Sequence, residues 1–332
     1  MKVGNISQTV WRRSVNNQLD KKDDRLLNVP SYNDTVMAVC NEDGKLSLMA
    51  VGRSFGKSPR TALYAAMQAV NEILIRKGKA DYIVLEFTLP VFTSEAQLKS
   101  MIENVKIYAK DKGILLSGVT TEVNPAVSRF ICRATVYGTA DKEKWISLSK
   151  AHKDEDIVLL GTAGLEGMAR ILDEKEEELE NYFNGVFLRQ CKGRYKELDA
   201  SYGAAALKDI DISAVRQIGS GGIMAALWNI TEGTNVGFEA DLSKMTVYQE
   251  TIEVLEHYNL NPYDMTSNGS FLLMTSNGKE ALKVLEEAGV KATIIGTSKE
   301  GNIKVIGTKD DERFLDRPSP DELMRWWQEE LS

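Results

Sequence analysis

The sequence predicts an α+β protein with two domains. Its 332 residues exceed what a single hydrophobic core usually supports, which favours two domains. In the first half, apolar runs typical of strands are interrupted by two segments with helical spacing. The second half begins with a glycine-rich turn between a strand and a helix, and no repeat of fixed period runs through the chain.

The elements predicted for the first half follow the order β-β-α-β-α-β-β. They are strands over 35–41 and 46–51, a helix over 61–77, a strand over 81–87, a helix that begins at Ser94, and strands over 114–119 and 130–138. Asp43 and Gly44 between the first two strands are typical of a hairpin turn. Ser94 and Gln97 have the spacing of a capping box, which predicts a helix start.

A charged segment over 141–156 separates a first domain, residues 1–145, from a second domain, residues 150–332. The second domain opens with "DIVLLGTAGLEGMARIL" (156–172), which predicts a buried strand, a turn and a helix. The glutamate-rich stretch 171–185 predicts a helix whose acidic face is exposed to solvent.

Three features of the later chain complete the prediction. Residues 192–210 read as irregular, and a helix is expected around 211–217, before a second glycine turn. The final segment "SPDELMRWWQEEL" predicts a capped amphipathic helix. We expect its Trp326 and Trp327 to dock on the domain rather than bind a ligand.

Composition limits the classes of function. The net charge of −7 argues against nucleic acid or a membrane surface as the main partner, but a nucleotide needs only a local positive site. Cys40, Cys132 and Cys191 are far apart in the sequence, which is typical of a reduced protein and gives no support to a zinc site. No signal peptide or transmembrane segment is apparent, so we expect a cytoplasmic protein.

Two glycine turns are candidate phosphate sites, because free amides at the start of a helix favour an anion. The first contains Gly161 and Gly164, and the second contains Gly221 and Gly222. Neither turn has the spacing of a dinucleotide fingerprint or a Walker A loop. Each therefore has a second interpretation, a tight turn with close packing.

The segment "GRSFGKSPR" (52–60), which we call the basic loop, is a third candidate. It is one residue short of a Walker A loop and lies just before the helix expected at 61. The candidate ligands of a phosphate group here are Arg53, Lys57, Ser58 and Arg60. The alternative is an exposed basic loop without a ligand.

These pieces, in this order, resemble the aminoimidazole ribonucleotide (AIR) synthase superfamily. The likeness is carried by "MKVGNISQTVWRRSV", "GVTTEVNPAVSR", "DIVLLGTAGLEGMARIL", "GGIMAALWNITEG" and "NPYDMTSNGSFLL", and it covers nearly the whole chain. The superfamily includes hydrogenase-maturation dehydratases and thiamine-monophosphate kinases, and the closest likeness is to AIR synthase-related proteins of unassigned function.

The resemblance implies a two-domain fold, a homodimer whose N-terminal sheets join into a shared barrel, and ATP bound with Mg²⁺. By position in the family's motifs, the implied metal ligands are Asp34, Glu72 and Glu122. Asn71 and Thr121 are implied nucleotide contacts by the same matching.

Four of the family's five acidic motifs are altered here, which puts Mg²⁺ and ATP turnover in doubt. Asp34 is kept without its neighbouring glycine, and the family's histidine-aspartate motif reads "RQIGSGG" (216–222). Arg53, Lys57 and Arg60 could instead neutralise phosphate directly.

Three functions follow from the resemblance. The first is an ATP-dependent enzyme that activates the oxygen of a small molecule by phosphoryl transfer. The second is a non-catalytic nucleotide- or anion-binding subunit, which pairs with itself or with a complete paralogue. The third is a dimeric scaffold that binds no nucleotide. The sequence does not identify an acceptor substrate or any catalytic residue.

Overall fold

The chain folds as two compact units. The computed structural model describes residues 6–19, 23–31, 34–146, 150–232, 234–308 and 311–330. The N-terminal unit contains Arg12–Trp145 together with Asp173–Glu176, and the C-terminal unit contains the remainder. Residues 147–149 of the predicted boundary segment lie outside the described residues.

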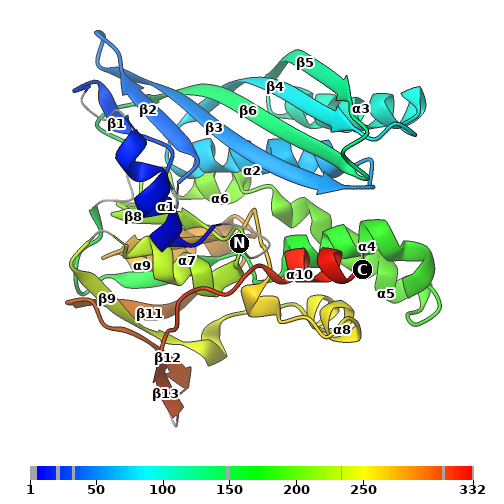
Figure 1. The fold of residues 1–332 in the computed structure, drawn as a ribbon. Coiled ribbons are helices and arrows are strands. Elements are labelled where there is room, and N and C mark those ends of the chain that lie inside the picture. The colour runs from blue at the N-terminus through cyan, green and yellow to red at the C-terminus, as the bar shows by residue number, and fades with distance from the viewer. Residues whose placement is uncertain are drawn as a thin grey trace. The chain divides into compact units, whose positions relative to one another are not determined.

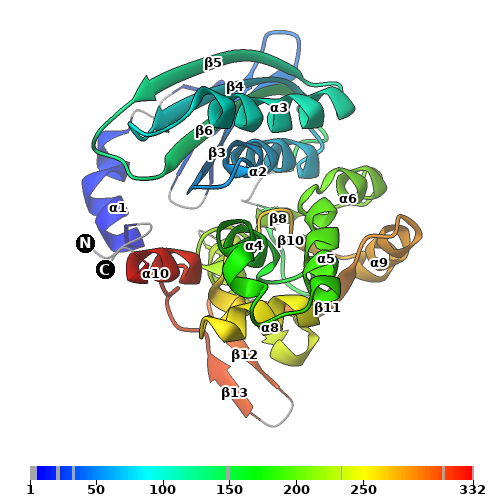
Figure 2. The ribbon, with the colours of Figure 1, turned by 90° about the vertical axis from the view of Figure 1, so that its right-hand side faces the viewer.

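The N-terminal unit is a six-stranded sheet, and the two long helices α2 (Thr61–Ile75) and α3 (Glu95–Asp111) lie on one face of it (Figures 1 and 2). Its elements are β1 (Leu26–Asn28), β2 (Val36–Cys40), β3 (Lys45–Gly56), α2 (Thr61–Ile75), β4 (Lys79–Leu89), α3 (Glu95–Asp111), β5 (Leu115–Val123) and β6 (Phe130–Asp141). The short helices α1 (Gln8–Ser14) and η1 (Asn16–Gln18) precede them. The predicted order of seven elements is therefore present, with β1 as an addition, and the capping box of Ser94 and Gln97 is confirmed.

The strands of this sheet follow the order β1-β2-β3-β6-β4-β5. Only β4 and β5 pair in parallel; the other described neighbours are antiparallel. Burial alternates along β3 and β6, so every second side chain enters the core beneath α2 and α3. None of the helices described for this unit covers the opposite face of the sheet (Figure 2).

Small residues bring α2 close to the centre of the sheet. Ala62, Ala65, Ala66 and Ala69 of α2 are all fully buried. At Gly52 of β3, an added Cβ would lie 2.0 Å from the Ala65 carbonyl oxygen. This close approach packs α2 against the C-terminal part of β3, which contains residues 52–56 of the basic loop.

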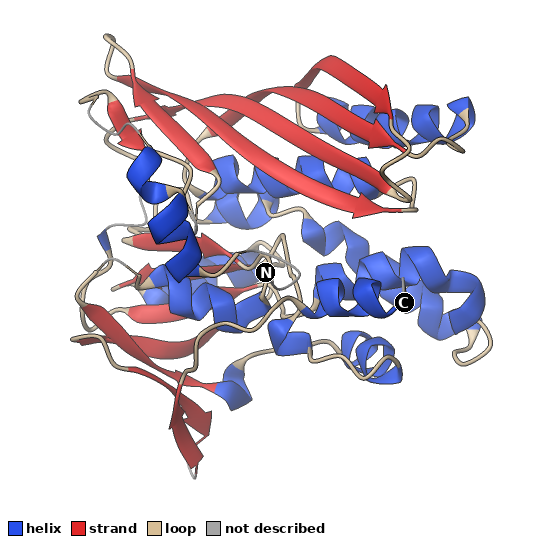
Figure 3. Ribbon diagram, in the orientation of Figure 1, coloured by secondary structure: helices blue, strands red, loops and turns tan. Residues whose placement is uncertain are grey.

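The C-terminal unit contains a seven-stranded sheet of order β13-β12-β9-β11-β7-β10-β8. Its elements are β7 (Asp156–Leu160), α4 (Leu165–Leu179), α5 (Gly185–Gly193), η3 (Arg194–Leu198), α6 (Ser201–Ala206), β8 (Ala214–Gln217), α7 (Gly222–Ile230), β9 (Val236–Asp241), η4 (Leu242–Lys244), α8 (Gln249–His257), η5 (Pro262–Asp264), β10 (Phe271–Thr275), α9 (Gly278–Glu287), β11 (Ala292–Glu300), β12 (Lys304–Thr308), β13 (Asp311–Phe314) and α10 (Glu322–Glu329). Figure 3 shows β12 and β13 at one end of this sheet, where they project beyond the other strands. The mixed α+β architecture of two sheets is confirmed.

Two local predictions for this unit were wrong. The segment expected to be a helix around 211–217 forms β8, a largely buried strand paired with β10. Residues 192–210, expected to be irregular, include the end of α5, then η3 and α6. In both places tertiary pairing and packing outweigh a weak local signal. Among the described residues, no helix is long and apolar enough to cross a membrane.

We expect Gly52→Ala to destabilise the N-terminal unit, because the new methyl group would collide with the backbone of α2. Overpacking of this kind costs about 1–3 kcal/mol, and the obstacle here is backbone rather than a movable side chain. Gly193→Ala at the end of α5 is the control, since an added Cβ there meets no atom within 4 Å. Urea denaturation measures the free energy of unfolding of both variants. Equal urea midpoints for the two variants would contradict the prediction.

Candidate functional site

The segment 52–60, expected to be a loop, is a loop only in its second half: Gly52–Gly56 form the end of β3 and pair with β6, and residues 57–60 connect β3 to the N-terminus of α2. The backbone amide of Arg53 donates to Gln68 Oε1 of α2 at 2.8 Å, which ties the end of the strand to the helix. The side chains of Arg53 and Lys57 are exposed, and neither forms a hydrogen bond or ion pair with another described residue. The loop therefore presents two cations to solvent.

The other side of the loop is occupied by a carboxylate of the chain itself. Ser58 Oγ and the Tyr64 hydroxyl donate to Asp173 Oδ2 at 3.0 and 2.8 Å, and Arg60 Nη1 lies 2.6 Å from Oδ1. Asp173 belongs to helix α4, in the four residues that group with the N-terminal unit. A negative charge at a helix N-terminus is stabilised by the helix dipole and by the first amides.

A second carboxylate lies beside the first. Glu174 Oε1 accepts the Lys57 amide at 3.0 Å, and its other oxygen pairs with Arg129 Nη1. The side chains of Asp173 and Glu174 are only 3% and 6% exposed. The expectation of a solvent-exposed acidic face over 171–185 is thus wrong for these two residues, because they pair with distant cations.

The candidate metal ligands Asp34 and Glu72 lie on either side of an arginine. Arg76 Nη1 is 3.2 Å from Asp34 Oδ2, and Arg76 Nε is 3.4 Å from Glu72 Oε2. The guanidinium is fully buried and lies 5.6 Å from the ring centre of Trp145. Burial alone lowers the pKa of Arg76, but the charges of Asp34 and Glu72 outweigh it, so the pKa is raised and the cation persists.

The third candidate ligand does not join the other two acids. Glu122 is exposed on the edge strand β5, where its Oε1 accepts Asn124 Nδ2 at 3.3 Å. Thr121 is its exposed neighbour, whereas Asn71 is fully buried on α2. Among the described residues, no three His, Cys, Asp or Glu side chains gather as a metal site would require.

The glycine turns of the C-terminal unit use their amides internally. Gly161, Gly164, Gly221 and Gly222 each donate the backbone N–H to an acceptor in the chain. These acceptors are, in the same order, the Lys291 carbonyl, the Ser267 hydroxyl, the Asp321 carboxylate and the Gly219 carbonyl. The amides that would contact a phosphate are therefore already bonded.

Close packing accounts for glycine at both turns. Gly161 has a φ of +86°, and an added Cβ would lie 2.4 Å from Ser270 Oγ. Gly222 has a φ of +65°, and its added Cβ would lie 2.2 Å from the Tyr263 carbonyl oxygen. The interpretation as tight turns thus has direct structural support.

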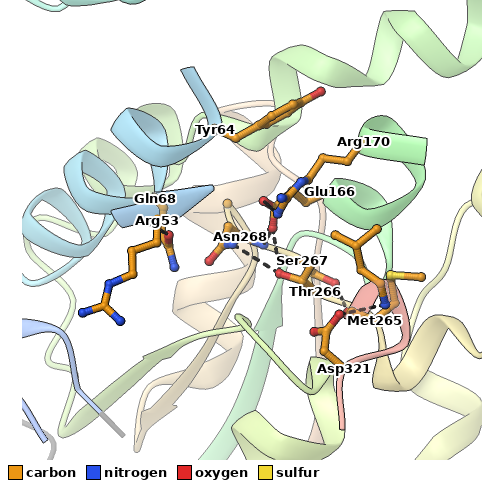
Figure 4. A network of polar contacts seen from close by, with 12 residues as sticks. Arg53, Tyr64, Gln68, Glu166, Arg170, Met265, Thr266, Ser267, Asn268 and Asp321 are labelled. Atoms are coloured by element: carbon orange, nitrogen blue, oxygen red, sulfur yellow. Dashed lines mark hydrogen bonds and ion pairs between the residues drawn. The ribbon is translucent and has the colours of Figure 1, made fainter. Parts of the chain in front are cut away.

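A buried polar network follows the first glycine turn (Figure 4). Glu166 of α4 accepts the Thr266 hydroxyl at 2.8 Å and both the amide and the side chain of Asn268. It also pairs with Arg170 one turn further along α4, at 3.3 Å. The Arg170 guanidinium lies 4.7 Å from the ring centre of Trp327. Local sequence reasoning missed this network, although Glu166 and Arg170 have the i,i+4 spacing of a helical ion pair.

Asp321 links the second glycine turn to the C-terminal helix. Its two oxygens accept the amides of Gly221 at 2.7 Å and Leu323 at 2.9 Å, so it also caps α10. Burial raises the pKa of Asp321 to about 7, although both hydrogen bonds act to lower it. Trp326 and Trp327 of α10 are buried, which confirms their predicted docking role.

A shallow pocket of about 280 Å³ lies elsewhere in the C-terminal unit, beside β9, β11 and β12. Its charged lining residues are Glu239, Asp241, Lys244 and Glu312. This excess of carboxylates disfavours a phosphate ligand, and none of the predicted site residues lines the pocket.

Comparison with known proteins places the fold. Residues 153–308 match the family described as "AIR synthase related protein, C-terminal domain". A protein named for hydrogenase expression and formation, from Methanocaldococcus jannaschii, is 21% identical over 266 residues, which cover 79% of this chain and 77% of that protein.

Solved structures agree over most of the chain. A chain in the HypE–HypF complex is similar with a TM-score of 0.68 and 18% identity, over 93% of this chain and 99% of that one. Hydrogenase maturation protein HypE in complex with ATP is similar with a TM-score of 0.65 and 16% identity, over 91% and 92%. The predicted resemblance to the AIR synthase superfamily and its hydrogenase-maturation proteins is confirmed.

The raised pKa of Asp321 predicts a pH-dependent contribution to stability. Between about pH 4 and pH 7 the unfolded chain loses this proton while the folded protein keeps it, so the free energy of unfolding falls as pH rises. The slope from this group is at most about 1.4 kcal/mol per pH unit. Asp321→Asn cannot ionise and should lose that slope.

Urea denaturation of both proteins from pH 4.5 to pH 8 (about the range that the shift spans) checks this. Asn offers one oxygen to two amides, so the variant is expected to be less stable at low pH, with the difference shrinking as pH rises. A difference that stays constant across the range would contradict the pKa assignment.

Proposed function

We propose, from the confirmed resemblance to the AIR synthase superfamily, that this protein is a non-catalytic, nucleotide-binding subunit of the hydrogenase-maturation type. One observation carries the proposal: the Arg76 guanidinium lies between Asp34 and Glu72. The charge that a metal ion would bring to these carboxylates is supplied by the chain.

The residues present do not fit a bound Mg²⁺ ion. Mg²⁺ requires close oxygen ligands in octahedral geometry and binds through carboxylates, phosphates and waters. Here an ion would have to displace a fully buried guanidinium, and Glu122 is not beside the other two acids. Without the metal, phosphoryl transfer from ATP loses its main electrostatic support.

Nucleotide binding is supported by the exposed cations of the basic loop. Arg53 and Lys57 are free to contact phosphate oxygens, and charge-assisted hydrogen bonds of this kind need no metal. The structurally similar hydrogenase maturation protein HypE is known in complex with ATP. We therefore assign ATP, or another small molecule that carries phosphate, as the ligand class.

The likeness to an ATP-bound protein also favours a second candidate, an ATP-dependent enzyme that activates the oxygen of a small molecule. This candidate requires a metal-dependent nucleotide site. A scaffold that binds no nucleotide is the remaining alternative.

Isothermal titration of ATP, with Mg²⁺ and with a chelator, separates these functions. We expect binding under both conditions with similar affinity, and a dissociation constant roughly tenfold higher for Lys57→Ala. Lys106→Ala, on the exposed side of α3, is the matched control and should bind as the wild type does. Binding that requires Mg²⁺ and leads to hydrolysis would favour the enzyme, and the absence of binding would favour the scaffold.

We propose further that the open face of the six-stranded sheet is a dimer interface. The strand registers align Met37, Met49, Tyr137, Tyr82 and Leu115 in one row across β2, β3, β6, β4 and β5. Three of these apolar side chains are between 44% and 63% exposed. A second sheet of the same kind, from an identical chain or a paralogue, would cover the row.

Tyr137→Glu tests this interface, because it places a charge at the middle of the apolar row. We expect the wild type to sediment as a dimer, and the variant to dissociate with a constant at least about tenfold higher. Ile107→Glu is the control, since Ile107 is 69% exposed on α3 and lies outside the row. A Tyr137→Glu protein that dimerises as tightly as this control would rule out the interface.

A further inference from the structure

We propose that Asp173 and Glu174, which we call the acidic pair, compete with a phosphate-bearing ligand for the basic loop. The proposal concerns the regulation of the site described above and therefore rests on the proposed function. In this structure the acidic pair occupies the Lys57 amide, the Ser58 hydroxyl and the Arg60 guanidinium of the loop, so a ligand gains these donors only when the pair withdraws.

The donors around Asp173 are those that a phosphate group would use. They are a hydroxyl from Ser58, a guanidinium from Arg60 and a phenol from Tyr64, all within 3.0 Å of the carboxylate oxygens. Arg60 is the N-cap residue of α2 and Tyr64 lies in its first turn, so these donors are held in place by the start of that helix. A carboxylate and a phosphate have the same requirement for charged and polar donors, so one can replace the other.

Glu174 completes the occupation of the loop. Its carboxylate accepts a hydrogen bond from the Lys57 amide and forms an ion pair with the Arg129 guanidinium, and its side chain is nearly fully buried. An added Cβ at Gly56 would lie 2.5 Å from Glu174 Oε1, so glycine leaves room for this carboxylate. The loop thus makes specific contacts with both members of the acidic pair, and Gly56 leaves the space that Glu174 fills.

Helix α4 is interrupted at Lys175, directly after the acidic pair. Lys175 has a φ of −125° and a ψ of 22°, values outside the helical region, while its neighbours on both sides belong to α4. The residues Asp173–Glu176 group with the N-terminal unit, whereas both flanks of α4 group with the C-terminal unit. A break in the helix lets these four residues move without unwinding the whole element.

Ligand and acidic pair exclude one another for an electrostatic reason. Two carboxylates and a polyphosphate in one partly buried site would place like charges within a few ångströms, which strongly disfavours simultaneous occupation. Ligand binding and release of α4 at 173–176 are therefore coupled, and each opposes the other by the same factor.

Titration of sodium tripolyphosphate and of ATP into the variant Asp173→Asn/Glu174→Gln tests the competition. This variant keeps the shape of both side chains and removes their charges. We expect it to bind tripolyphosphate roughly tenfold more tightly than the wild type. Glu177→Gln/Glu180→Gln changes the net charge equally at two exposed positions nearby and is the matched control.

A second measurement does not depend on the stability of the variant. In the wild-type protein, amide hydrogen exchange at 173–176 should accelerate when tripolyphosphate is added at saturating concentration. Unchanged exchange at saturation, or a double variant that binds no more tightly than its control, would overturn the competition.

The two proposals fail in different ways. If ATP binds the wild type and the double variant equally, the competition is wrong while nucleotide binding stands. The double variant could bind tripolyphosphate more tightly than the wild type while ATP binds neither protein. In that case the acidic pair does compete for an anion site, and the assignment of a nucleotide as the ligand is wrong. If neither compound binds either protein, both proposals are wrong.

Discussion

The N-terminal unit is organised around one buried positive charge, the guanidinium of Arg76. A cation without water must find partners, and removing one partner from such a buried group typically costs about 3–5 kcal/mol. The partners come from different segments: Asp34 precedes β2, and Glu72 lies one turn earlier on α2. The ring of Trp145, shortly after β6, lies beside the same guanidinium. One charge thus joins the segment before β2, the helix α2 and the segment after β6.

The same principle recurs at three of the places where the chain was expected to bind a ligand. Acidic side chains of α4 occupy the basic loop, an arginine occupies the expected metal ligands, and the turn amides donate to acceptors of the chain. Each is an internal substitute for an external ion. These internal substitutes, in a chain similar in fold to AIR synthase-related proteins, are the reason for which we propose binding rather than catalysis.

The sequence predicted local structure best where the signal itself was local. Three predicted features depend only on residues a few positions apart, and the structure contains all three. They are the turn at Asp43 and Gly44, the capping box at Ser94, and the helix before Lys77. Arg76 lies within the helix predicted over 61–77, one turn after Glu72, yet nothing in the local pattern indicates that Asp34 is also its partner. Asp173 and Glu174 were wrongly expected to be exposed for the same reason, since the arginines that pair with them are more than forty positions away in the sequence.

The sequence by itself determined the α+β class, the order of most elements and the resemblance to the AIR synthase superfamily, because spacing and motif order are properties of the chain alone. Only the tertiary structure decided which charges meet. A carboxylate has the same local appearance whether it faces water, a metal ion or a buried guanidinium, and its partner depends on contacts between distant segments. For Asp34, Glu72, Asp173 and Glu174 those contacts are with arginines and loop donors of the same chain.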